Sequence, residues 1–279
     1  MTALLLCADP LAPARSRRAD PHFAREAEAA ALTAVIDHDA LARGDVEEAV
    51  RRVPRDLGPA WYRGWMIGSD RYADLERALA DRGCRLLTDA ARYRRAHELP
   101  GWYEVFQGRT PASVWTAEPS DDWLAEAAAR LGSAGAVVKD FVKSRKHEWA
   151  TACHVPDLGD RAALRRVVDA FLDLQGEDLC GGVVLRAFED FTGPEARVWW
   201  LDGAPAAVTA HPDTPGERVE PDLAGVGERV AALGCRFVTT DLVRRADGAW
   251  RVVEVGDGQV SDFPEDTEVR PLIEALSNA

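Results

Sequence analysis

The segment from Cys235 to Gln259 constrains the fold of this chain more than any other stretch of its sequence. It contains two short apolar runs on either side of Asp247-Gly248, and an Asp-Gly pair between such runs is the strongest short-range signal of a β-hairpin. Alternation of side chains along a strand places Asp241 and Glu254 near the same end of the two strands, with Asp257 just beyond. The hairpin therefore predicts three carboxylates that converge at one end of a sheet.

Converging carboxylates repel one another unless a cation neutralises them. Oxygen ligands suit Mg²⁺, which usually takes one or two carboxylates together with substrate phosphates. The spacing equally allows a surface hairpin whose acidic side chains face water. Features upstream of the hairpin decide between these two interpretations.

The charge of the chain limits its partners. The formal net charge is -13, and a general nucleic-acid binder needs a basic surface to neutralise phosphates, so we expect no nucleic-acid partner. Local basic clusters at residues 15–18, 92–95 and 143–147 still allow a small ligand that carries phosphate.

Cysteine use and hydropathy indicate a cytoplasmic protein. The five cysteines are odd in number, widely spaced and without zinc-binding spacing, so we expect reduced thiols, most of them in the core. No apolar run approaches the ~18 residues that a membrane helix needs, and the run at residues 3–7 is too short for a signal peptide. We therefore predict a cytoplasmic location, no membrane partner, and a buried first strand at residues 4–7.

The pattern of expected elements divides the 279 residues into about two domains. Strands at 4–7, 32–37, 61–65 and 84–87 alternate with helices at 21–31 and 70–82, which predicts an α/β domain over residues 1–110 with a parallel sheet. A polar, proline-bearing stretch at 108–121 marks the boundary. Beyond it we expect strands at 136–142, 149–155, 182–188, 197–201 and 204–210 and helices at 122–130, 160–174, 223–233 and 268–279. This second half, residues 111–279, is predicted to be α+β.

Two cationic residues lie inside apolar strands of the second half. Lys139 lies within Ala136–Val142, and Arg186 lies within Gly182–Phe188. A strand lysine is often an edge or solvent-facing residue; alternatively, each of these cations binds a phosphate at a fixed position. Lys143 and Lys146 follow in a basic loop, which is either a solvated turn or a flexible flap over phosphates. No Walker, HExxH, GxSxG or kinase signature is present.

The order of these features resembles the ATP-grasp superfamily. The resemblance covers about residues 60 to 264 and is carried by Lys139 with its basic loop, Val183 to Glu189, Glu195 to Gly203, Thr240-Asp241 and Val252 to Val255. It is closer still to a small ATP-grasp clade in which Asp-Gly-Gln-Val-Ser follows the metal glutamate, here Asp257 to Ser261.

The resemblance implies an ATP-grasp fold with an N-terminal Rossmann-like domain (1–110) and an ATP-grasp domain (111–279) of two lobes, about 111–180 and 181–279. It implies ATP and Mg²⁺ as cofactors, and ATP-dependent ligation of a carboxylate to an amine through an acyl phosphate, with release of ADP and phosphate. The substrates would be small and polar, such as an amino acid or a short peptide-like metabolite, and a homodimer is allowed. A nucleotide-binding module without activity and a phosphotransferase on the same fold stay open as alternatives.

The resemblance also implies roles for individual residues. Lys139 and Arg186 would bind the ATP phosphates, Lys143 or Lys146 would reach the γ-phosphate, and Arg197 would stabilise the acyl phosphate. The hinge that meets adenine would be Ala187, Phe188 and Glu189, with Glu189 or Glu195 near the ribose, and Asp241 and Glu254 would hold Mg²⁺.

This sequence departs from the superfamily pattern at two positions. Gly256 stands where the family hairpin usually has Asn, so we expect Asp257 to supply the missing metal ligand. Arg186 stands in place of the second strand lysine, and a planar guanidinium binds phosphate as a fork.

Arg63 is the candidate for substrate binding. It ends a predicted parallel strand in Trp61-Tyr62-Arg63-Gly64-Trp65, and α/β sheets present their ligand sites at the carboxyl ends of strands. A buried arginine paired with a structural acid explains this position equally well.

Overall fold

The computed structural model describes residues 2–11, 18–132 and 134–279. Contacts divide the chain into two compact units. The first unit comprises Met1–His97, Pro194–Leu242 and Glu254–Ala279, and the second comprises Glu98–Gly193 and Val243–Val253. Of the predicted basic cluster at residues 15–18, only Arg18 lies within the described residues.

The first unit contains a parallel four-stranded sheet in the order β2-β1-β3-β4. Its strands are β1 (Ala3–Cys7), β2 (Thr33–Ile36), β3 (Gly58–Arg63) and β4 (Cys84–Leu86). The helices between them are α1 (Ala24–Ala29), α2 (His38–Ala42), α3 (Val46–Val50), α4 (Ser69–Ala80) and α5 (Ala90–His97). Every residue of β1 is buried, as expected of a parallel strand covered on both faces. The predicted α/β alternation is therefore confirmed.

Most of a second sheet, with the order β10-β9-β11-β12, also belongs to the first unit. Its strands are β9 (Phe191–Leu201), β10 (Ala204–Ala210), β11 (Phe237–Arg245) and β12 (Trp250–Asp257), and α9 (Val226–Leu233) precedes β11. The predicted hairpin is present as β11 and β12, and Arg245 N donates to Ala249 O across its turn. At the β9–β10 turn Asp202 and Gly203 both have positive φ, the conformation of the tight hairpin turn that favours Asp-Gly.

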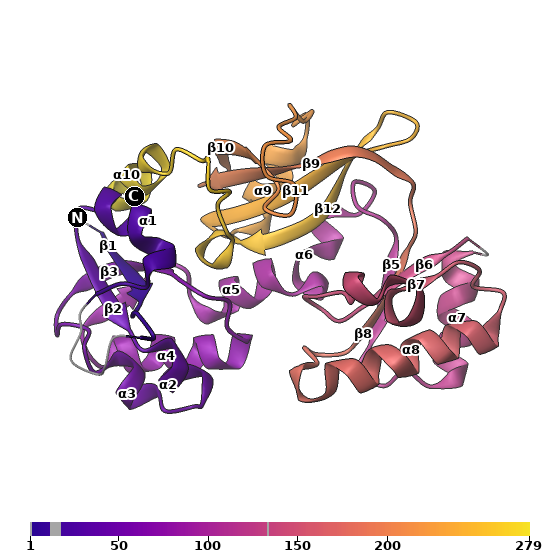
Figure 1. Cartoon of the computed structure of the whole chain (residues 1–279), viewed down its shortest axis with the longest axis horizontal. Helices are drawn as coiled ribbons and strands as arrows, with labels where there is room; N and C mark the ends of the chain where they lie inside the picture. The colour runs from indigo at the N-terminus through magenta and orange to yellow at the C-terminus, as the bar shows by residue number, and fades with distance from the viewer. Residues whose placement is uncertain (1, 12–17, 133) are drawn as a thin grey trace. The chain divides into compact units, whose positions relative to one another are not determined.

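The C-terminal helix α10 (Arg270–Asn278) completes the first unit. Thr2 N donates to Ser277 O at 3.1 Å, and the indole Nε1 of Trp61 donates to Leu276 O at 3.0 Å. The two termini consequently lie close together (Figure 1). One apolar core joins Leu4 to Leu86 with later residues that include Trp199, Phe237, Leu272 and Ile273.

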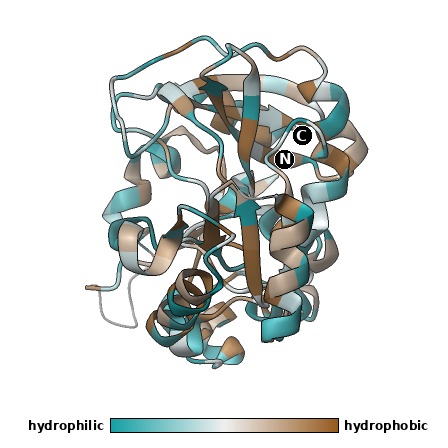
Figure 2. Cartoon of the chain, turned by 90° about the vertical axis from the view of Figure 1, so that its right-hand side faces the viewer, coloured by the Kyte–Doolittle hydropathy of each residue, from teal (hydrophilic) through white to brown (hydrophobic). Residues whose placement is uncertain are grey.

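The second unit is built on an antiparallel sheet in the order β5-β8-β6-β7. Its strands are β5 (Ser113–Thr116), β6 (Ala136–Lys139), β7 (His154–Val155) and β8 (Val183–Ala187), and its longer helices are α6 (Leu99–Phe106), α7 (Asp121–Leu131) and α8 (Arg161–Gln175). The apolar faces of α7 and α8 share a core with the strands. Figure 2 shows apolar residues in brown on strands and hydrophilic residues in teal on much of the helix surface.

Some boundaries differ from those predicted. The first unit ends its initial segment at His97 and regains residues 194–242 and 254–279, because these later segments pack into the same core as the N-terminal sheet. Strand β6 stops at Lys139, because Asp140 Oδ1 accepts from the backbone N–H groups of Val142 and Lys143 and closes a turn. Most of the strand expected at 149–155 is a π-helix, Trp149–Cys153, which packs against α8, so tertiary packing overrides strand propensity there.

Other predictions concern the cysteines and the membrane. Four of the five cysteines are buried and Cys180 is half-buried, and all are free thiols. Within the described part of the chain, no helix has both the length and the apolar character needed to cross a membrane.

Candidate functional site

A buried ion pair between Arg197 and Asp241 forms the centre of the candidate site in the first unit. Arg197 lies on β9 and Asp241 on the neighbouring β11. The guanidinium donates through Nε to Oδ1 and through Nη2 to Oδ2, both at 2.8 Å, which is the bidentate geometry of the strongest arginine–carboxylate pairs. The structure therefore brings together the predicted catalytic arginine and a predicted metal ligand.

His211 joins this pair immediately after β10. Its Nε2 lies 3.5 Å from Oδ2 of Asp241 and 3.3 Å from Nη2 of Arg197. Burial acts to raise the pKa of Asp241, but Arg197 and His211 outweigh it and hold that pKa well below its usual range. Burial acts to lower the pKa of His211, but its bond to Asp241 raises that pKa overall.

A β-bulge in β10 puts His211 in this position. The Asp202-Gly203 turn starts a register in which Ala204 pairs with Leu201 and Pro205 with Trp200. The register then shifts by one residue, so that Thr209 pairs with Arg197, and His211 N donates to Glu195 O. Without the shift His211 would have moved one residue along β9, and a slip of one residue turns a side chain to the other face. The sequence pattern does not single out His211, because a bulge leaves no clear signal in it.

Glu195, His211 and Asp241 form a candidate metal centre. Each offers one ligand atom, the atoms all lie within 4.8 Å of one another, and no other group of three such residues occurs among the residues described. Burial, Asp241 and Glu254 all raise the pKa of Glu195, so this cluster holds more negative charge than its surroundings stabilise. Such a donor set fits a divalent cation, with carboxylate oxygens that suit Mg²⁺ and an imidazole that suits transition metals.

Glu254 and Asp257 occupy different environments. Glu254 is exposed and acts electrostatically on Glu195 and Arg197, so it belongs with the cluster. Asp257 is fully buried, and its Oδ1 accepts from the backbone N–H and the side-chain Nε2 of Gln259. The three-residue spacing turns Glu254 and Asp257 to opposite sides of β12. The placement of Asp257 thus corrects its predicted role as a metal ligand, because its contacts belong to the core.

Gly256 stands close to β11. A Cβ atom at this position would lie 3.0 Å from Thr239 Oγ1, whose hydroxyl shares a 2.7 Å hydrogen bond with Ser261 Oγ. The space that an asparagine would need is therefore taken by the Thr239–Ser261 pair.

Arg63 is buried, with 1% of its surface exposed. Its Nε lies 2.7 Å from Glu26 Oε2, its Nη1 donates to Gln259 O, and the rings of Phe23, Trp199 and Phe263 lie 5.0–5.7 Å from its guanidinium carbon. These contacts correct the predicted substrate-binding role and match the alternative of an arginine paired with a structural acid.

Gln259 explains why Asp-Gly-Gln-Val-Ser follows β12. Its Oε1 accepts from Tyr62 N at 2.9 Å, and its Nε2 donates to Tyr72 Oη and to Asp257 Oδ1, both at 3.0 Å. Its carbonyl oxygen accepts from Gly64 N. This run therefore ties the end of β12 to β3 within the first unit.

In the second unit, Lys139 and Arg186 lie on adjacent strands. Arg186 pairs with Val137 and Lys139 pairs with Val184, so alternation places both cations on one face as diagonal neighbours. Both side chains are buried, at 6% and 7% exposure. Lys139 Nζ donates to Val142 O at 3.1 Å.

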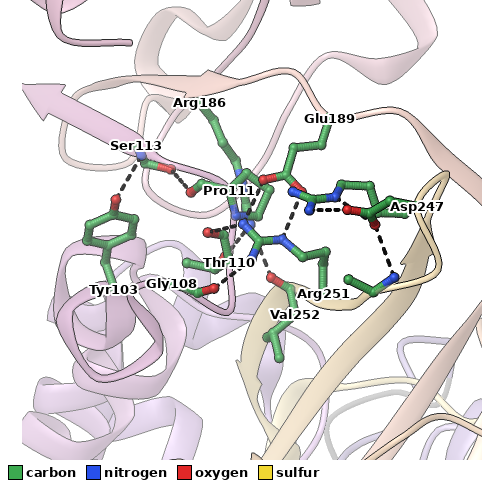
Figure 3. Close-up of polar contacts among 12 residues, drawn as sticks. Tyr103, Gly108, Thr110, Pro111, Ser113, Arg186, Glu189, Asp247, Arg251 and Val252 are labelled. Carbon is green, nitrogen blue, oxygen red and sulfur yellow. Dashed lines mark hydrogen bonds and ion pairs between the residues drawn. The ribbon is translucent and has the colours of Figure 1, made fainter.

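The surroundings of Arg186 join three segments of the second unit (Figure 3). Its Nη2 donates to Thr110 Oγ1 at 2.6 Å and to Val252 O at 3.4 Å, and its guanidinium carbon lies 5.8 Å from the ring centre of Trp102. The sequence pattern does not single out Thr110, because its link to Arg186 spans 76 residues.

The remaining predicted ligands of the second unit surround this face. Lys143 and Lys146 are exposed in the loop after β6, and Phe188 is 41% exposed beside His154. The backbone N–H groups of Ala187 and Phe188 donate to Ala112 O and Gly135 O, so adenine would have to meet other groups of the hinge. The carboxylate of Glu189 accepts two hydrogen bonds from Arg251, a residue that the sequence pattern also misses.

Comparison with known proteins places this geometry in context. Residues 130–276 match the model of a protein family described as an ATP-grasp domain, the third family of its clade. No curated protein matches the chain at a significant level.

Several solved structures share the fold over nearly the whole chain. A RimK domain ATP-grasp protein from Sphaerobacter thermophilus DSM 20745 is 16% identical, with 100% of both chains covered and a TM-score of 0.63. The D-cycloserine synthetase DcsG is 17% identical, with 99% of this chain and 98% of that chain covered and a TM-score of 0.65. The macrocyclase MdnC, bound with precursor peptide MdnA from Microcystis aeruginosa MRC, is 13% identical, with 100% of both chains covered and a TM-score of 0.58.

Proposed function

Because this chain belongs to that family of ATP-grasp domains, we propose that it is an ATP-dependent ligase that joins a carboxylate to an amine. In this reaction the carboxylate oxygen attacks the γ-phosphorus of ATP and ADP leaves. The amine nitrogen then attacks the acyl carbon, an amide bond forms, and phosphate leaves. The observation that carries the proposal is the buried pair of Arg197 and Asp241 within a cluster of further carboxylates.

The cluster in the first unit fits Mg²⁺. Asp241, Glu195 and Glu254 would hold it, and bound Mg²⁺ would neutralise charge on the phosphates. An ionised carboxylate has about four acceptor sites, so Asp241 keeps acceptor capacity while both of its oxygens accept from Arg197. The same pair holds Arg197 in one orientation, from which its guanidinium would stabilise the charge of the acyl phosphate.

Cationic residues of the second unit would bind the nucleotide. Lys139 and Arg186 share one face of the sheet and would contact phosphates, while Lys143 and Lys146 in the following loop would reach the γ-phosphate. These roles supply positioning and charge neutralisation, which account for most of the catalysis in phosphoryl transfer.

The substrates we propose are a small polar carboxylate and a small polar amine, such as amino acids or short peptide-like molecules. The formal net charge of -13 disfavours a long polyanionic substrate, because the protein would repel it. Among the similar structures are a D-cycloserine synthetase and a macrocyclase bound with a precursor peptide, and both names are compatible with substrates of this class.

The proposal is tested by removing single charges from the cluster. We expect Asp241→Asn and Glu254→Gln each to lower Mg²⁺-dependent ADP formation by about 100-fold, since loss of a ligand or of its support weakens metal sites by 10–100-fold. The matched control is Asp266→Asn, which removes an exposed carboxylate of the same unit that pairs with Arg218. Circular dichroism checks the fold of each variant, and unchanged ADP formation in both cluster variants would refute the metal assignment.

A nucleotide-binding module without ligase activity is the second candidate, and the filled space at Gly256 favours it. Incubation of the protein with ATP, Mg²⁺ and pooled amino acids separates the candidates. ADP together with a condensed mass identifies a ligase, a phosphorylated product identifies a phosphotransferase, and nucleotide binding without turnover identifies the module.

A further inference from the structure

Arg251 makes a set of contacts that no predicted role explains. It lies on β12, within the second unit, and its side chain is 12% exposed. Its Nε and Nη2 donate to the two carboxylate oxygens of Glu189 at 2.8 and 2.6 Å. Its Nη1 donates to Gly108 O at 2.7 Å, and its Nη2 also donates to Thr110 O at 2.8 Å (Figure 3). One guanidinium therefore holds β12, the hinge after β8 and the loop at residues 108–110.

Thr110 connects Arg251 to Arg186. The carbonyl oxygen of Thr110 accepts from Arg251, and its hydroxyl oxygen accepts from Arg186 at 2.6 Å. Val252, the next residue after Arg251, extends the connection, because its carbonyl oxygen also accepts from Arg186 and its N–H donates to Arg109 O. A shift of Arg251 would therefore move two acceptors of Arg186.

The charges around Thr110 favour the same arrangement. Arg186 and Arg251 both bond to this one residue, and two like charges held so close repel each other. Glu189, with a side chain 13% exposed, compensates the charge of Arg251 through a bidentate pair that water screens little. The charge of Arg186 is then available for an anion.

We propose that Arg251 is a positioning residue that acts through Thr110 to fix the guanidinium of Arg186 for phosphate binding. This inference rests on the proposed function, in which Arg186 contacts the nucleotide. The planar fork of arginine reaches four acceptors in three segments, whereas the ammonium of lysine is a point charge that cannot reproduce the bidentate pair with Glu189.

The test compares Arg251→Lys, Thr110→Val and the double variant, with affinity for Mg²⁺–ADP measured by titration calorimetry and stability measured by thermal unfolding. We expect each single variant to raise the Kd on the order of tenfold, as loss of a supporting contact does at ligand sites. Because both changes break the same path, the double variant should weaken binding no more than either single variant. The matched control is Arg165→Lys, since Arg165 in the same unit also bonds to a carbonyl oxygen, of Pro119, and pairs with Asp169. Its Kd should not change.

The possible outcomes separate this inference from the proposed function. Additive losses in the double variant, or an unchanged Kd in Thr110→Val, overturn the path through Thr110. An unchanged Kd in a folded Arg251→Lys protein with lowered stability shows a purely structural role and overturns the inference alone. If Arg251→Lys does not fold, Thr110→Val decides, because it keeps the size of the buried side chain. A native protein that binds no Mg²⁺–ADP overturns the proposed function and the inference together.

Discussion

Asp257 shows how strongly one buried position changes the chemistry of a side chain. The carboxyl is fully buried, and although it accepts hydrogen bonds from Gln259, burial raises its pKa from 3.8 to about 7. Arg63, buried in the same unit, counteracts this rise only in part. The native protein thus holds a proton on Asp257 at pH values where the unfolded chain has lost it.

The pH dependence of stability should reveal this proton. Between pH 4 and about 7 the native state binds one more proton at Asp257 than the unfolded state, so the free energy of unfolding falls as pH rises through this window. By linkage the fall amounts to at most about 4 kcal/mol. Urea unfolding at several pH values measures it, and we expect Asp257→Asn to remove this part of the slope.

The comparison of native and variant profiles is essential, because burial also raises the pKa of Glu26 and adds a slope of the same sign. That slope remains in Asp257→Asn and cancels in the difference. Identical profiles for the native protein and the variant would show that Asp257 is ionised in the fold.

Strand β8 depends on two glycines that precede it. A Cβ atom at Gly182 would lie 2.2 Å from Thr116 O, an atom of the adjacent strand β5 that cannot move independently of its backbone. At Gly181, φ is +73°, and a Cβ atom would lie 2.1 Å from the ring of Phe141. The close approach of β5 and β8 therefore requires residues without side chains at this point.

Replacement of Gly182 by alanine should destabilise the second unit. The added methyl group forces the backbone of β5 or β8 to shift, which costs about 1–3 kcal/mol of unfolding free energy. Gly68→Ala is the control, because nothing lies within 4 Å of a Cβ atom there and its φ of -63° suits any residue. We expect the control to change stability by no more than about 0.5 kcal/mol. Equal effects of the two substitutions in denaturant titrations would contradict the packing argument.

At the scale of the whole molecule, the first unit takes its core from distant parts of the chain. Trp61 packs with Phe237, whose ring also stacks on that of Trp199. The buried residues of α10 complete the same core, in which Leu272 and Ile273 are at most 3% exposed. The segment predicted as an N-terminal domain consequently lacks much of its own core when it is separated from residues 194–279.

A fragment of residues 1–110 should therefore fail to fold by itself. Its parallel sheet would expose the apolar surface that later segments cover, and burial of such surface is the main source of stability. Hydrogen exchange and denaturant unfolding measure this, with the full chain as the reference. A cooperative transition in the isolated fragment, with protected amides in β1 and β3, would contradict the shared core.

Local chemistry determined several features from the sequence alone. The Asp247-Gly248 and Asp202-Gly203 turns predicted both hairpins, because turn conformation depends on the residues of the turn itself. Apolar runs and their spacing likewise predicted the strands and helices of the N-terminal sheet. The face shared by Lys139 and Arg186 depends on strand pairing, but their presence within buried strands was visible in the pattern.

Only the tertiary structure decided which side chains meet. A bulge directs His211 to Glu195, and the alternation of β12 turns Asp257 away from Glu254 and into the core. Partners such as Arg63 with Glu26 and Arg251 with Glu189 lie 37 and 62 residues apart in the chain. Such pairs depend on register, on bulges and on the packing of distant segments, and local residue patterns carry no record of these.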